Sequence, residues 1–234
     1  MSDKTDLSSL VQDQIEYYRA RANEYDQWFF RQGRYDQGEA LNRLWFQEVE
    51  QVRLALRDFK PAGQVLELAC GTGLWTQQIV AHADRVLALD SSAEAIALNL
   101  ARLKSAKVEY RQADIFDWQP QETCDVVFFG FWLSHVPPDR FATFWHTVAQ
   151  ALKPGGRVFF VDSRYSETSS ARDHMLEGPQ ATTIGRRLND GREYRIVKVF
   201  YQPQELQTRL AGLGFRATVR QTSNYFFYGQ AELA

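Results

Sequence analysis

Residues 67–73 read Glu-Leu-Ala-Cys-Gly-Thr-Gly and stand between an apolar run at 64–69 and a helical pattern at 74–83. Glycines in such a loop let the backbone turn sharply and lie close to a ligand. The helix that follows presents free N–H donors in its first turn. The stretch therefore predicts a strand, a ligand-binding loop and a helix, the unit from which doubly wound α/β sheets are built.

The same alternation continues toward the C-terminus. Strands are expected at residues 85–90, 107–113, 125–131 and 157–162, helices at 93–104 and 138–152, and a turn at 153–156. Strands that are apolar throughout and separated by helices indicate a parallel sheet that is covered on both faces. The last part of the chain departs from this order. It predicts a hairpin at 183–201 around Asp190-Gly191, a helix at 203–213 and an antiparallel pair of strands at 216–222 and 225–232.

The N-terminal part has a different pattern. Ile15, Tyr18, Ala22, Tyr25 and Phe29 recur at steps of three and four residues, which predicts one helix over residues 9–31. A break is expected at 33–38 and a second helix at 39–58.

Acidic residues end the two strands that follow the glycine loop. Asp90 lies 17 residues after Gly73, at a position that suits a carboxylate accepting both hydroxyls of a ribose. Asp114, followed by Ile115, can accept from an exocyclic amine and flank a flat ring. Because the carboxyl ends of parallel strands meet at one edge, these residues and the loop together indicate one adenosine-sized ligand.

Five segments in this order resemble the class I S-adenosylmethionine-dependent methyltransferases. They are residues 67–73, 87–90, 112–118, 124–136 and 152–162, and the likeness covers about residues 61–163 and extends more loosely to the end. The resemblance implies an α/β fold, a doubly wound, seven-stranded Rossmann-like sheet of order 3-2-1-4-5-7-6 with strand 7 antiparallel. It also implies an N-terminal helical lid, S-adenosylmethionine (SAM) as methyl donor and S-adenosylhomocysteine (SAH) as product.

The resemblance also implies a cofactor site. Its expected residues are Tyr18, Arg21, Glu67, Ala69, Gly71, Gly73, Asp90, Ser91, Asp114, Ile115 and Phe131. The loop residues would hold the methionine part, Asp90 and Ser91 the ribose, and Asp114 and Ile115 the adenine, while Tyr18 and Arg21 would close over it as a lid. Ala69 stands where the family pattern has its first loop glycine, which is tolerable if φ there is negative.

Candidates for the acceptor side follow the fourth and fifth strands. His135 has an unperturbed pKa near 6.5 and is a possible general base, although it could equally pack, cap the next helix or contact the cofactor. Trp132, Asp162, Arg186 and Arg195 are the expected substrate residues. Basic residues of the hairpin would recognise a carboxylate or phosphate, or form a solvated strand face. The insert at 164–182 is long enough to act as a substrate lid, and His174 is expected only to be part of it.

The favoured function is methyl transfer to a small molecule, at a hydroxyl or carboxylate oxygen by in-line displacement. N- or C-methylation of a small molecule, a nucleic-acid methyltransferase and a non-catalytic SAM-binding interaction subunit stay open as alternatives. A nicotinamide dinucleotide fits less well, since Thr76 occupies the third position of a GxGxxG pattern. Residues 131–134 also lack the Asn/Asp-Pro-Pro-aromatic motif that adenine-N6 enzymes typically carry.

Composition narrows the class of protein further. The 234 residues are 44% apolar and carry a net charge of −2, so no global basic field favours nucleic acid. Cys70 and Cys124 form no CxxC pair, and no metal site is expected. The polar first residues and the lack of an 18-residue apolar run predict a cytoplasmic protein without signal peptide or membrane span. We expect one domain over 1–234, either monomeric or homodimeric, with a helical cap at 1–60, a cofactor core at 61–163 and a substrate-side part at 164–234.

Overall fold

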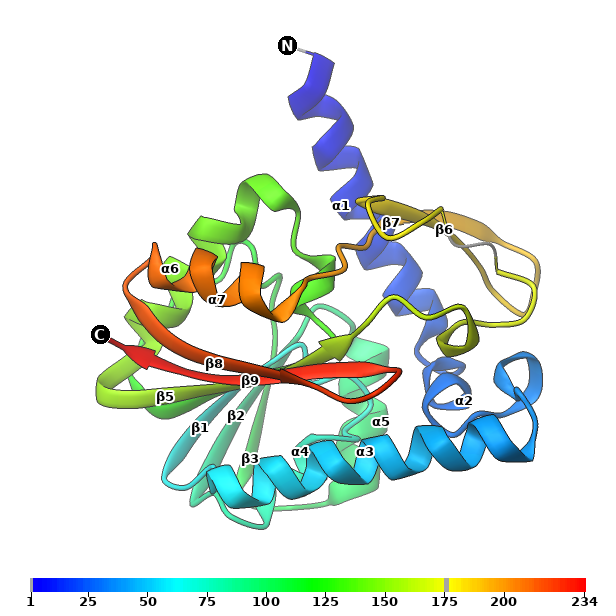
Figure 1. The fold of residues 1–234 in the computed structure, drawn as a ribbon. Helices are drawn as coiled ribbons and strands as arrows, with labels where there is room; N and C mark the ends of the chain where they lie inside the picture. The colour runs from blue at the N-terminus through cyan, green and yellow to red at the C-terminus, as the bar shows by residue number, and fades with distance from the viewer. Residues whose placement is uncertain (1, 175–176) are drawn as a thin grey trace.

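A seven-stranded sheet lies between two layers of helices in the computed structural model (Figure 1). The structure describes the backbone of residues 2–174 and 177–234, and the side chains of 9–174 and 177–234. Part of the insert predicted as a lid, Met175 and Leu176, lies outside the described residues.

The sheet has the order β3-β2-β1-β4-β5-β9-β8. Its strands are β1 (Gln64–Leu68), β2 (Arg85–Asp90), β3 (Val108–Gln112), β4 (Cys124–Gly130), β5 (Leu152–Ser163), β8 (Phe215–Gln221) and β9 (Phe226–Leu233). The first five strands pair in parallel, and β9 runs antiparallel to both β5 and β8. This confirms the predicted order with its antiparallel last strand.

Helices cover both faces of the sheet. One face carries α3 (Glu39–Phe59), α4 (Thr76–Val80) and α5 (Ala93–Leu103), and the other carries α6 (Phe141–Ala151) and α7 (Pro203–Ala211) (Figure 1). Strand β4 shows why the central strands have apolar residues on both faces. Phe128 packs into the core under α3 and α4, while Phe129 packs against α6, and both are fully buried. Burying a side chain of this size contributes about 1.5–3 kcal/mol, so both faces stabilise the sheet.

The prediction of one helix over residues 9–31 is wrong. The chain forms α1 (Ser2–Arg21), a turn at 22–24, and a short α2 (Tyr25–Phe29). The Glu24 amide donates to the Arg21 carbonyl at 2.7 Å and closes the turn. The change of direction lets Trp28 and Phe29 enter the core against Trp45, which a continuous helix could not do. Tertiary packing has overridden local periodicity here.

Other boundaries differ in detail. The predicted helix 138–152 begins as a 3₁₀ turn, Pro138–Arg140, before α6 starts at Phe141. The expected turn at 153–156 is part of β5, because Leu152 already pairs with Cys124 across a register shift. The helix predicted at 74–83 is reduced to α4 at Thr76–Val80.

The predicted hairpin forms a separate two-stranded sheet, β6 (Thr183–Arg187) and β7 (Glu193–Val197). It packs on α1 through a small cluster in which Tyr17 meets Ile184 and Ile196. Figure 1 shows this hairpin and α1 beyond the ends of the central strands, above α2. The hairpin and the N-terminal helices therefore enclose the carboxyl edge of the sheet.

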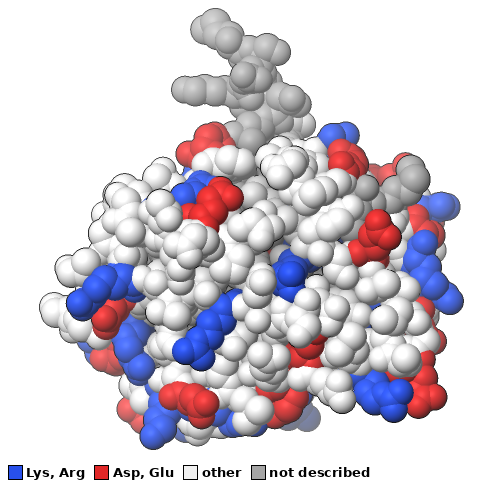
Figure 2. Space-filling view, in the orientation of Figure 1, with Lys and Arg blue, Asp and Glu red and all other residues white. Residues whose placement is uncertain are grey.

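The surface is mixed in charge. In the view of Figure 2, acidic and basic side chains are interspersed over the visible face. Within the described residues, no helix combines the length and the apolar character needed to cross a membrane.

Candidate functional site

A cavity of about 730 Å³, part of it open to solvent, lies at the carboxyl ends of β1 to β4 under α1. Its wall contains eight of the eleven residues that were predicted to bind the cofactor. These are Tyr18, Ala69, Gly71, Asp90, Ser91, Asp114, Ile115 and Phe131, together with Trp132 and His135.

The glycine loop is held in an unusual backbone conformation. Gly71 has φ +52°, and a Cβ added there would meet open space, so its backbone borders the cavity. Gly73 has φ +91°, and a Cβ there would lie 2.5 Å from the Asn99 amide oxygen. Asn99 donates to the carbonyls of Cys70 and Gly71 and to the Thr76 hydroxyl, which fixes the loop from behind.

Ala69 contradicts the expectation of a negative φ. Its φ is +55°, in the left-handed region that glycine occupies in the family pattern. A Cβ in this conformation costs about 1–2 kcal/mol. The loop therefore keeps the backbone path of the pattern and accepts strain from the alanine methyl.

Two carboxylates face the cavity as predicted. Asp90 accepts from the amides of Gly71 and Ser92 at 2.8 and 2.9 Å, so its position is set by the backbone. Asp114 accepts from the Phe116 amide at 2.9 Å. An ionised carboxylate has about four acceptor positions, which leaves lone pairs on both residues for a ligand's hydroxyl or amino groups.

Two predicted cofactor residues, Glu67 and Gly73, lie behind the cavity wall rather than in it. Glu67 is fully buried, and burial raises its pKa to about 8. Its Oε2 atom has no hydrogen-bond partner among the described residues. A role for Glu67 in cofactor binding stays a prediction.

The N-terminal segment is fastened to the cofactor side of the sheet. Asp26 of α2 accepts from the Thr72 hydroxyl at 2.6 Å and pairs with Arg102 at the end of α5. Arg19 of α1 pairs with Glu94 of α5 at 2.9 Å. These contacts place the lid over the loop that borders the cavity.

A second cavity of about 560 Å³ adjoins the first on the side of the β6–β7 hairpin. Four residues line both: Tyr18, Tyr25, Phe131 and His135. Three cationic side chains, Arg21, Arg186 and Lys198, line the second cavity, and none of its described lining residues is acidic. Arg21, expected at the cofactor, lines this second cavity and not the first, and its contact with the cofactor stays a prediction.

Arg21 is 7% exposed, and its guanidinium lies over the rings of Tyr25 and Tyr17, at 5.0 and 5.6 Å from the ring centroids. It donates to the Tyr35 hydroxyl at 3.3 Å, and its Nε has no partner. Among the described side chains, neither Arg21 nor Arg186 forms an ion pair. Both cations are therefore available to an anion in the cavity.

The ammonium group of Lys198 is held by a buried hydrogen-bond network. Its Nζ donates to the Ser134 hydroxyl at 2.7 Å and lies 3.5 Å from Asp162. Asp162 accepts from the Ser134 amide and hydroxyl at 2.8 Å each, so it lies beneath the cavity and not in its wall. Burial lowers the pKa of Lys198 to about 8.

His135 is also buried and has both ring nitrogens engaged. Nδ1 lies 2.7 Å from the Val197 carbonyl, and Nε2 lies 2.7 Å from the Tyr18 hydroxyl. A carbonyl only accepts, so Nδ1 carries the hydrogen and Nε2 accepts the Tyr18 proton. Burial, followed by the charge of Lys198, lowers the pKa of His135 well below 6.5. The ring is therefore neutral.

His174 is a residue that sequence reasoning missed. It lines the basic cavity, and its ring lies between Arg34 and Arg186, 3.3 Å from the Arg186 guanidinium. Burial lowers its pKa to about 4. No sequence signal pointed to it, because its neighbours come from segments far apart in the chain.

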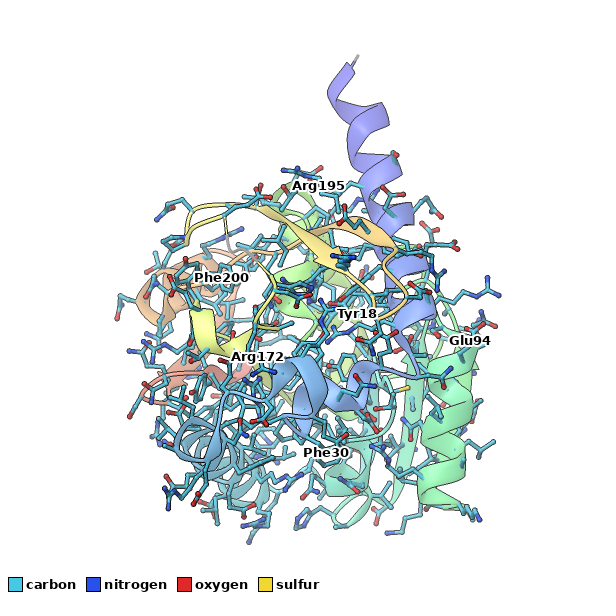
Figure 3. The ribbon with its side chains drawn as sticks, turned by 90° about the vertical axis from the view of Figure 1, so that its right-hand side faces the viewer. Tyr18, Phe30, Glu94, Arg172, Arg195 and Phe200 are labelled. Atoms are coloured by element: carbon cyan, nitrogen blue, oxygen red, sulfur yellow. The ribbon has the colours of Figure 1, made fainter. Side chains whose placement is uncertain are left out.

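Arg195 does not join the site. It donates to the Thr183 hydroxyl at 2.7 Å and pairs with Glu177 at 3.5 Å, on the outer side of the hairpin. Figure 3 shows Arg195 on that side and Tyr18 below the hairpin, toward the interior. Of the four expected substrate residues, only Arg186 lines the basic cavity, and Trp132 lines the cofactor cavity.

Comparisons with known proteins agree with this geometry. Residues 65–156 match the family described as "Methyltransferase domain". A ubiquinone biosynthesis O-methyltransferase from Xanthomonas axonopodis pv. citri (strain 306) is 30% identical over 216 residues, which cover 89% of this chain and 82% of the relative. The chain belongs to the class I SAM-dependent methyltransferases.

Solved structures extend the likeness to the whole chain. The DhpI-SAH complex is 40% identical with a TM-score of 0.76, and covers 96% of this chain and 97% of its own. The DhpI-SAM-HEP complex is 41% identical with the same TM-score, and covers 95% and 97%. A trans-aconitate 2-methyltransferase from Azoarcus sp. (strain BH72) is 32% identical over 126 residues, 53% of this chain and 48% of the relative.

SAM fits the first cavity by the chemistry of its wall. The carboxylates of Asp90 and Asp114 suit the hydroxyl and amino groups of an adenosine. Gly71 has no side chain, so the backbone there can lie close to the remainder of the cofactor. The protein is a SAM-dependent small-molecule methyltransferase.

Proposed function

We propose that this methyltransferase transfers the methyl group of SAM to an oxygen atom of a small acceptor that binds as an anion. The observation that carries the proposal is the second cavity. It adjoins the cofactor cavity, and its wall has two cationic guanidiniums and a lysine but no acidic side chain among the described residues.

Burying charge without partners is costly, which argues for a ligand that compensates it. Lys198 has Asp162 beneath it, whereas Arg21 and Arg186 have no carboxylate at ion-pair distance among the described side chains. A carboxylate or phosphate group could accept hydrogen bonds from both guanidiniums. An amine acceptor, cationic at neutral pH, would be repelled by the same three residues.

An anionic oxygen needs no general base. SAM, when bound, supplies a methyl group activated by positive sulfur, and the S–CH₃ bond breaks as the O–CH₃ bond forms. The chain must then align the acceptor and exclude water. Arg21, Arg186 and Lys198 orient the anion, while Tyr25 and Phe131, which line both cavities, border the acceptor and the cofactor alike.

This account gives His135 a different task from the one first expected. Its single lone pair already accepts the Tyr18 proton, so it is not free to take a proton from an acceptor directly. A general base at His135 stays a prediction for a hydroxyl acceptor, and it would require the proton to pass through Tyr18.

The relatives support oxygen and anionic acceptors. One is named an O-methyltransferase, and another is named for trans-aconitate, an organic anion. The enclosed cavity under α1 and the hairpin favours a small molecule over a nucleic acid. A cytoplasmic location and a monomeric or homodimeric state remain expectations.

The proposal is tested with Arg186→Gln and a matched control. Arg192→Gln removes a guanidinium from the same hairpin, but Arg192 is exposed and pairs with Asp190 at 2.8 Å. Hydrogen bonds to charged groups contribute about 1.5–3 kcal/mol, so Arg186→Gln should raise KM for the acceptor by about tenfold or more. Arg192→Gln should leave it unchanged. Equal KM values for wild type and Arg186→Gln would overturn the anion site.

A further inference from the structure

The Tyr18 hydroxyl stands where the two cavities meet, and its hydrogen has a fixed direction. Tyr18 lines both cavities and donates to Nε2 of His135 at 2.7 Å. The direction follows from the tautomer, because Nδ1 of His135 must donate to the Val197 carbonyl. With its proton committed to His135, the Tyr18 oxygen presents only lone pairs to the space between the cavities.

The surroundings hold this arrangement firmly. Gln14 of α1 donates to the His135 carbonyl at 3.0 Å and accepts from the Val197 amide at 3.1 Å. The Tyr18 and His135 rings meet edge to face, 5.1 Å between centroids. Among the described residues, no donor is hydrogen-bonded to the Tyr18 oxygen. Figure 3 shows Tyr18 reaching inward from α1 under the hairpin.

An oxygen that only accepts cannot donate to an anion, but it attracts positive charge. The positive group in this reaction is the sulfonium with its methyl. We propose that Tyr18 recognises the charged methyl-sulfonium end of SAM through its lone pairs, and that His135 is the positioning residue that keeps them aimed there. This goes beyond a lid contact with the cofactor's carboxylate, and it concerns the cofactor alone, so it does not rest on the acceptor being an anion.

The proposal explains a conflict of charge at the junction. Arg21, Arg186 and Lys198 are all cationic, and they lie on the far side of the residues that the cavities share. A sulfonium brought to this border is repelled by them. The oxygen lone pairs of Tyr18, which lines both cavities, supply a compensating negative potential. SAH carries neither the positive sulfur nor the methyl group and has no need of this contact.

The test is calorimetric binding of SAM and SAH, without acceptor, to wild type, Tyr18→Phe and Tyr194→Phe. Tyr194 is the matched control, because it packs on Tyr17 at the same α1–hairpin contact but lines neither of these two cavities. A weak C–H···O contact is worth about two- to fivefold in affinity. Tyr18→Phe should weaken SAM by this factor and leave SAH within error. Tyr194→Phe should change neither ligand.

The role of His135 is tested in the same assay. His135→Gln retains an amide that can donate to Val197 and accept from Tyr18, so it should keep the wild-type ratio of SAM to SAH affinity. His135→Leu frees the Tyr18 hydrogen to turn toward the cavity, so the ratio should fall as in Tyr18→Phe. Thermal unfolding shows whether the leucine variant is folded, and the phenylalanine variant decides the matter if it is not. Equal loss of SAM and SAH affinity in Tyr18→Phe, or no loss at all, overturns the proposal.

Discussion

Lys198 gives the site a pH dependence that can be worked out from its position. Burial lowers its pKa to about 8, so it is charged below that pH and neutral above it. A bound anion favours the charged form. We therefore expect kcat/KM for the acceptor, which reports the free enzyme, to fall as pH rises through about 8. The value of kcat reports the enzyme with the anion bound, in which the pKa of Lys198 is higher, so kcat should fall only at higher pH. Arginine stays charged throughout this range, so Lys198→Arg should move the alkaline limb of kcat/KM upward.

The outcome is read from pH profiles of wild type and Lys198→Arg. An alkaline limb that stays in place in the variant would assign it to another group. His135, neutral because its pKa lies well below 6.5, should add no acidic limb near that value.

Ala69 is a residue where the sequence departs from its family and the backbone does not. Its φ of +55° places a methyl group where glycine is favoured. Glycine removes about 1–2 kcal/mol of strain and adds about 0.5–1 kcal/mol of backbone entropy cost. Ala69→Gly should therefore raise the free energy of unfolding by about 0.5–1 kcal/mol, a rise in Tm of about 1–4 °C.

A control for this variant is Ala101→Gly, at an exposed position inside α5, where glycine should cost up to about 1 kcal/mol. Thermal unfolding of both variants without ligand decides the matter. A lower Tm for Ala69→Gly would show that the loop is not strained.

At the scale of elements, α2 connects the lid to the cofactor loop. Asp26 accepts from the Thr72 hydroxyl and pairs with Arg102, which is partly buried. Asp26→Asn keeps an acceptor for Thr72 but removes the charge pair, worth about 0.2–1 kcal/mol. We expect SAH to dissociate about two- to fivefold faster, measured by stopped-flow displacement.

Arg19→Gln is the matched control, since Arg19 and Glu94 are more exposed and their pair should contribute little. If both variants released SAH at the wild-type rate, the Asp26 contacts would not hold the lid. If both accelerated release equally, general loosening of the N-terminal helices would explain the effect.

The whole molecule shows which features a sequence can predict. Strands β1, β2, β4 and β5 were predictable because they are largely apolar and buried, whereas the edge strand β3 (Val108–Gln112) is mostly polar and only partly buried. The glycine loop at 67–73 indicated which edge of the sheet borders the cavity. The break between α1 and α2 was not predictable, because packing of Trp28 against Trp45 decides it. Asp90 and Asp114 were also predictable as cavity residues. Each stands at the carboxyl end of a strand, and that edge of the sheet borders the cavity.

Only part of the basic cavity could be predicted from the sequence. Hairpin cations were evident, but alternation along an isolated two-stranded sheet did not show that Arg186 faces inward and Arg195 outward. Arg21 and His174 join them from α1 and the insert, more than a hundred residues apart in the chain. Such convergence is a property of the tertiary structure alone.

The central claim is that an anionic oxygen acceptor binds beside the cofactor. It is tested most directly by methyl transfer from isotopically labelled SAM to small carboxylates and phosphates, each paired with a neutral amide or amine of the same size. The account predicts labelled esters from anions and no transfer to their neutral or cationic counterparts. Faster methylation of an amine than of any anion in the panel would contradict it.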